Sequence, residues 1–168
     1  PGLAKVLERN GFKETEELGQ LILNLMSLRA LKLINAGARQ RMITLVKNTV
    51  EGKNKPEHLK LISREELLRR YIKFYEVIAG RPTYVSLLLQ YPLAAKRLGD
   101  VLGSGKWAAE YLNRHPLLLD ELWDERLSQI DDYTPVDFSF YIERTRARLA
   151  DIPEDDQETR MNLIREVH

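Results

Sequence analysis

The chain has 168 residues, with 26 Lys and Arg against 25 Asp and Glu, and it contains no cysteine. This length suits one domain or two small subdomains that bury a core. Nucleic acids and anionic membranes bind proteins that carry a large surplus of positive charge. The near-equal charges leave no such surplus, so we expect neither as a partner. The lack of cysteine excludes disulfides, iron–sulfur clusters, thiol catalysis and thiolate zinc sites, and it fits a location in the cytoplasm.

Apolar residues recur at spacings of three and four along almost the whole chain, and no sustained alternation typical of strands is present. The sequence therefore predicts an all-α fold, an irregular bundle of about eight or nine helices without a sheet. In the first third we expect helices over residues 3–9, 14–34 and 38–50. Asn10-Gly11 should end the first of these helices, and Asn35-Ala36-Gly37 should separate the other two.

The stretch Glu51-Gly52-Lys53-Asn54-Lys55-Pro56 is the most linker-like part of the sequence, because it combines charges with helix-breaking residues. It predicts a boundary between an N-terminal helical segment, residues 1–52, and a main helical bundle, residues 57–168. The alternative is that both parts form one continuous domain.

Helix signals are clearer after this stretch. Ser63 and Glu66 have the spacing of a capping box, and they predict a helix that runs to about Ala79 with enough apolar residues to be buried on two sides. Shorter helices are expected over 83–90, 93–102, 106–113 and 117–123. Ser104 is the expected N-cap of the helix over 106–113. Two more are expected over 134–150 and from 152 onward.

No motif in the sequence predicts an active site. Gly103-Ser104-Gly105-Lys106 resembles a phosphate-binding loop, but Trp107 occupies the place of the Mg²⁺-binding Ser or Thr, so we favour a turn between helices. The pairs Asp131-Asp132 and Asp155-Asp156 favour solvated or helix-start roles over a metal site. The three histidines, His58, His115 and His168, lack ligand spacing, and the arginine clusters favour solvated helix faces.

The most specific pattern lies between residues 78 and 122. It consists of Arg81, Tyr84, Pro92 and Trp107, followed by the run His115-Pro116-Leu117-Leu118-Leu119-Asp120-Glu121-Leu122. This string resembles the central segment of bacterial bifunctional glutamine synthetase adenylyltransferase/adenylyl-removing enzymes, where it joins two nucleotidyltransferase modules. The chain departs from the family pattern at Gln90-Tyr91 and in the spacing of Ser104 from Trp107. The family's catalytic glycine-serine loop and Asp-x-Asp carboxylates have no counterpart in it.

The resemblance implies a parent enzyme that transfers AMP from ATP to glutamine synthetase with Mg²⁺, removes it again by phosphorolysis, and responds to glutamine and to the PII protein. This chain, with its start at Pro1 and its helical pattern up to His168, is expected to be a piece of that enzyme. It would be the non-catalytic helical linker or regulatory segment, which contacts the flanking modules, has no catalytic, cofactor or metal site and is inactive alone. The alternative is an independent all-α adaptor that binds a protein through residues 117–123.

Each residue of the string has two interpretations at this stage. Arg81 either caps the preceding helix or forms an interdomain salt bridge, and we favour the cap. Tyr84 and Trp107 are either core residues or interface anchors, and we favour the core. The leucines from Leu117 onward are more numerous than one helix face needs, so some of them are expected to dock on another module. Pro92, His115, Pro116 and Asp120 complete the candidate structural and interdomain positions.

Overall fold

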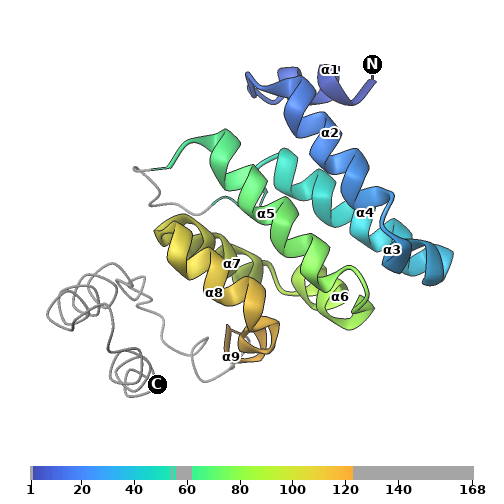
Figure 1. Ribbon diagram of the computed structural model, residues 1–168, viewed down its shortest axis with the longest axis vertical. Coiled ribbons are helices and arrows are strands. Elements are labelled where there is room, and N and C mark those ends of the chain that lie inside the picture. The colour runs from blue at the N-terminus through green and yellow to red at the C-terminus, as the bar shows by residue number, and fades with distance from the viewer. Residues whose placement is uncertain (1, 54, 56–61, 123–168) are drawn as a thin grey trace, which may run out of the picture. The chain divides into compact units, whose positions relative to one another are not determined.

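The computed structural model describes residues 2–53, 55 and 62–122, and all regular elements in these residues are helices (Figure 1). The prediction of an all-α fold is therefore confirmed. The elements are α1 Gly2–Arg9, α2 Thr15–Met26, α3 Arg29–Leu33, α4 Ala36–Val50, α5 Arg64–Ile78, α6 Pro82–Gln90, α7 Pro92–Ser104, α8 Lys106–Arg114, the 3-10 turn η1 Pro116–Leu118 and α9 Leu119–Leu122.

The chain divides into two compact units, Pro1–Leu127 and Ser128–His168, and the described residues all belong to the first. The helices predicted over 134–150 and from 152 onward lie outside the described residues. The same holds for both aspartate pairs, His58, His168 and Trp123.

The prediction of one helix over residues 14–34 is wrong, because the chain breaks between α2 and α3. Ser27 ends α2, where its hydroxyl donates to the Leu23 carbonyl at 2.7 Å, and Leu28 has an extended backbone with φ −56° and ψ 139°. A continuous helix would point Leu25 and Leu31 in directions about 120° apart. The break lets both side chains be fully buried in the core.

Two turn signals in this part of the chain work as expected. Gly11 follows α1 with a φ of 83°, a left-handed conformation that glycine adopts without strain. Asn35 caps α4 with its side-chain oxygen, which accepts from the Ala38 backbone N–H at 2.7 Å. Gly37 therefore lies in the first turn of α4 and does not break a helix. Helix α4 faces the core with three apolar side chains that are buried: Met42, Leu45 and Val46.

Helix α5 is the centre of the described unit. It packs against α2 and α4 on one side and against α7 and α8 on the other (Figure 1). The predicted burial of this helix on two sides is confirmed, because seven of its apolar and aromatic residues are buried: Leu67, Leu68, Tyr71, Ile72, Phe74, Tyr75 and Ile78. Ser63 starts the helix as predicted, because its hydroxyl accepts from the Glu66 N–H at 3.1 Å.

The two buried tyrosines of α5 find partners inside the core. The Tyr75 hydroxyl lies 2.6 Å from the hydroxyl of Thr49 on α4, and the Tyr71 hydroxyl donates to the Ala95 carbonyl on α7 at 3.4 Å. Desolvation raises the pKa of both phenols well above the ordinary value. Both side chains therefore stay neutral and tie α5 to its neighbours.

Contacts of the core cross the predicted boundary at residues 51–56. Helices α2 and α4 precede this stretch and pack against α5 and α6, which follow it. One hydrophobic cluster contains residues from both sides, for example Met42 and Ile78. These contacts favour the continuous alternative within the first compact unit, while the division into residues 1–52 and 57–168 stays a prediction.

Candidate functional site

The glycine-rich segment before α8 is a turn between helices, as predicted. Gly103 and Ser104 belong to the last turn of α7, and Gly105 has an extended backbone with φ 169° before Lys106 starts α8. The prediction that Ser104 caps α8 is wrong, because its hydroxyl donates backward to the Val101 carbonyl at 2.7 Å. The Lys106 amine lies 3.9 Å from the Glu110 carboxylate, so it pairs within its own helix.

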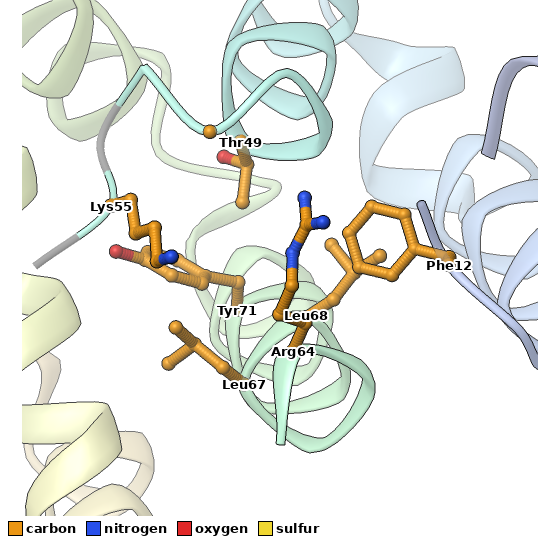
Figure 2. A pocket seen from close by; sticks show the side chains of 8 residues that line it. Phe12, Thr49, Lys55, Arg64, Leu67, Leu68 and Tyr71 are labelled. Carbon is orange, nitrogen blue, oxygen red and sulfur yellow. The ribbon is translucent and has the colours of Figure 1, made fainter. Parts of the chain in front are cut away.

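A small hollow lies next to the start of α5. It is lined by Phe12, Thr49, Gly52, Lys55, Arg64, Leu67, Leu68 and Tyr71 (Figure 2). The Arg64 guanidinium lies over the Phe12 ring at 4.8 Å from its centroid. The volume of about 40 Å³ holds a few water molecules, which is far too small for a nucleotide.

Residues 2–53, 55 and 62–122 lack two further features. No three His, Asp or Glu side chains lie close enough together there to bind a metal ion. In the same residues, no helix has the length and apolar character that a membrane span requires.

The most distinctive surface of the described unit is a row of rings on α8. Trp107 and Tyr111 stack with ring centroids 5.3 Å apart and an interplanar angle of 18°, and Tyr111 meets His115 with centroids 4.6 Å apart. Trp107 and Tyr111 are four residues apart and share one side of α8, and His115, the residue that directly follows the helix, extends the row through its contact with Tyr111. We call this row the α8 aromatic ridge.

The α8 aromatic ridge points away from the core. The core-facing residues of α8 are Ala109 and Leu112, both buried. Of the ridge, Trp107 is 43% exposed, Tyr111 is partly buried and His115 is exposed. The interpretation of Trp107 as a core residue is therefore wrong. The exposure of Trp107 follows from helical geometry, because Trp107 lies on a different side of α8 from the buried Leu112. Sequence reasoning also missed Tyr111, although its spacing of four from both Trp107 and His115 was a usable signal.

The other residues of the predicted string occupy the joints between helices. Arg81 is the N-cap residue of α6, and its guanidinium lies 5.9 Å from the centroid of the Tyr84 ring, which is partly buried against the core. Pro92 is the first residue of α7, and Pro116 opens η1 directly after His115. The structure thus brings Arg81 to Tyr84 and links Trp107 to His115 through Tyr111.

The leucine run after His115 is divided between core and surface. Leu119 is fully buried, Leu118 is partly buried and packs against the core, and Leu117 is 64% exposed. Asp120 is also exposed. Among Leu117, Leu118 and Leu119, the large apolar side chain of Leu117 is therefore left on the surface, close in sequence to the end of the α8 aromatic ridge.

These features define an all-α helical unit whose motif residues form helix joints and an exposed aromatic row. Comparison with known proteins is consistent with the resemblance of the string. A bifunctional glutamine synthetase adenylyltransferase/adenylyl-removing enzyme of Thioalkalivibrio sulfidiphilus is 30% identical over 164 residues, which is 96% of this chain and 16% of that protein. The protein of the same name from Nitrosococcus oceani is 31% identical over 95% of this chain and 16% of its own length. The one from Aromatoleum aromaticum is 42% identical over 62% of this chain and 11% of its own length.

The chain belongs, as a segment, to the family of bifunctional glutamine synthetase adenylyltransferase/adenylyl-removing enzymes. It spans between about a tenth and a sixth of the length of the relatives it matches. No family model matches the chain, and no solved structure matches it either.

Proposed function

We propose that this chain is a non-catalytic helical linker and regulatory segment of a cytoplasmic enzyme that adenylylates and deadenylylates glutamine synthetase. The single observation that carries the proposal is the match along nearly the whole chain to relatives that bear this name. In this proposal the parent enzyme uses ATP and Mg²⁺, and its nucleotidyltransferase modules flank the segment. The segment itself supplies packing surfaces and no reacting group.

Two features of the chain support a linker role over a catalytic one. The sequence contains neither the Asp-x-Asp carboxylates nor the glycine-serine loop that the resemblance assigns to the catalytic modules. Its one phosphate-loop candidate is used for a tight joint between α7 and α8. A unit without chemistry contributes to regulation when different ligands favour different packings of its helices against neighbouring modules.

The chemical part of the proposal is tested with the purified 168-residue chain and the full-length enzyme that contains it. Both are incubated with labelled ATP, Mg²⁺ and glutamine synthetase, and transfer and phosphorolytic removal of AMP are measured. We expect both activities from the full-length enzyme and none above background from the isolated chain. Turnover by the pure chain would show that the segment is itself catalytic.

The regulatory part of the proposal is tested with a variant of the full-length enzyme. In the full-length enzyme, a flexible Gly-Ser linker of equal length replaces this segment, and AMP transfer is measured with and without glutamine and PII. We expect transfer to persist and the response to these effectors to be lost. An unchanged response would contradict a regulatory role while leaving the family membership intact.

A further inference from the structure

The α8 aromatic ridge has the shape of a helix-packing element. Trp107, Tyr111 and His115 form a row of side chains spaced by four residues, and such rows fit into the grooves between side chains on a second helix. Stacking between the rings holds the row in place. A preordered row loses little side-chain freedom on binding, which favours docking.

The chemistry of the ridge also fits a protein interface. Trp and Tyr combine a large apolar ring with a polar tip, and they are enriched among the residues that contribute most to binding energy. Helix α8 already buries Ala109 and Leu112 against the core, and it carries the Lys106–Glu110 ion pair on another side. A helix with apolar residues on two sides and charges on a third is typical of a helix between two packing partners.

The size of the ridge decides what kind of partner it fits. Helix α8 has nine residues, so it is about 13 Å long. One side of such a helix, even with the 64% exposed Leu117, falls short of the roughly 1,000 Å² that a stable complex between separate proteins buries. A partner in the same chain needs much less area, because the tether keeps it at a high effective concentration.

We propose that the α8 aromatic ridge is the docking surface for an amphipathic helix from another part of the same full-length chain. The inference rests on the proposed function in one respect, that this chain is a segment of a longer enzyme. The relatives offer ample chain for such a helix, since the matched segment is 16% of the protein of Thioalkalivibrio sulfidiphilus. The partner helix presents apolar residues spaced by three and four to the rings.

The partner is identified by site-specific cross-linking of the full-length enzyme. A photoreactive benzoylphenylalanine replaces Trp107 in one variant and Tyr91 in a matched control, because these aromatic side chains are 43% and 44% exposed. We expect position 107 to cross-link to a peptide outside this segment, in the same chain and with apolar residues at helical spacing, and position 91 not to do so. A cross-link from position 107 only to a second copy, only to added glutamine synthetase, or only within the segment would overturn the inference.

The unmodified protein provides a second measurement, because the photoreactive residue itself replaces part of the ridge. Hydroxyl-radical footprinting compares the 168-residue chain with the full-length enzyme. We expect Trp107 to be oxidised several-fold more slowly in the full-length enzyme, and Tyr91 to react equally in both. Equal rates at Trp107 would overturn the docking inference. AMP transfer by the same wild-type sample tests the proposed function separately, so failure of either idea is recognised on its own.

Discussion

Helices α5 and α8 each carry aromatic residues at a spacing of four, but they use them in opposite ways. In α5 the rings of Tyr71 and Tyr75 lie 5.8 Å apart and are buried. In α8 the rings of Trp107 and Tyr111 lie 5.3 Å apart, and Trp107 is 43% exposed. The same local pattern therefore produces a piece of core in one helix and a piece of surface in the other.

The difference comes from the neighbours of each helix. Helices pack against α5 from both sides, and they supply a hydrogen-bond partner for each phenol, Thr49 from α4 and Ala95 from α7. Helix α8 uses a different side, with Ala109 and Leu112, for its core contacts. The spacing of aromatic residues thus determines that a row forms, and the packing of other helices determines whether the row is covered.

The strongest test of this contrast replaces one ring in each row. Tyr75→Ala removes a fully buried aromatic side chain, so we expect a loss of about 3–5 kcal/mol in the free energy of unfolding. Trp107→Ala removes a larger but half-exposed ring and is expected to cost below about 1 kcal/mol in the 168-residue chain. Urea unfolding followed by circular dichroism measures both values. Similar losses for the two variants would show that the ridge belongs to the core.

A second test uses the protonation of the buried phenols. Burial raises the pKa of Tyr71 and of Tyr75 in the folded chain above the ordinary value that each phenol has in the unfolded chain. At a pH between the unfolded and the folded pKa of a phenol, the unfolded chain loses a proton that the folded chain keeps. Stability is therefore complete below about pH 10 and falls above it, by roughly 1.4 kcal/mol per pH unit for each phenol.

Urea unfolding at a series of pH values from 8 upward checks this dependence, and Tyr75→Phe is the matched control. This variant should lose one phenol's share of the slope, and all other contributions cancel because the two proteins differ only at this hydroxyl. An identical slope with and without the Tyr75 hydroxyl would mean that this phenol ionises equally in the folded and unfolded chains.

Sequence reasoning could predict the buried row because α5 carries apolar residues on two sides, and it could predict the joints because Gly11, Asn35 and Ser63 act locally. It could not predict the break at Ser27-Leu28, where no proline or glycine stands. That break depends on burying Leu25 and Leu31 together, which is a tertiary requirement. The exposure of Trp107 was missed for a related reason, since composition identifies an apolar ring but not the helix that covers it.

The hydrogen bond between Thr49 and Tyr75 permits a finer test of the buried row. Thr49→Val leaves the Tyr75 hydroxyl buried without its 2.6 Å partner, so we expect a loss of about 1–3 kcal/mol. Tyr75→Phe leaves the Thr49 hydroxyl bonded to the Leu45 carbonyl at 2.9 Å, so its cost should be smaller, about 1 kcal/mol. Denaturant unfolding of both variants and of the double variant measures the coupling. A larger loss for Tyr75→Phe than for Thr49→Val would contradict this assignment.

The smallest effects concern polar contacts near the ends of helices, one of which joins α5 to α7. Arg70 on α5 accounts for one such joint, because its guanidinium donates to the Leu102 carbonyl of α7 at 2.7 Å and pairs with Glu66 at 3.1 Å. Arg70→Met keeps much of the side-chain volume but leaves a helix-end carbonyl without this donor, so we expect a loss of about 1 kcal/mol. Lys106→Met removes only a solvent-exposed pair at 3.9 Å and should change stability by less than about 0.5 kcal/mol.

Urea unfolding of both variants in 0.1 M and 1 M salt measures these losses. The difference in unfolding free energy between the two variants should persist in high salt, because the bond to Leu102 is partly buried and poorly screened. If high salt abolished the difference, the link between α5 and the end of α7 would be no stronger than an ordinary surface ion pair.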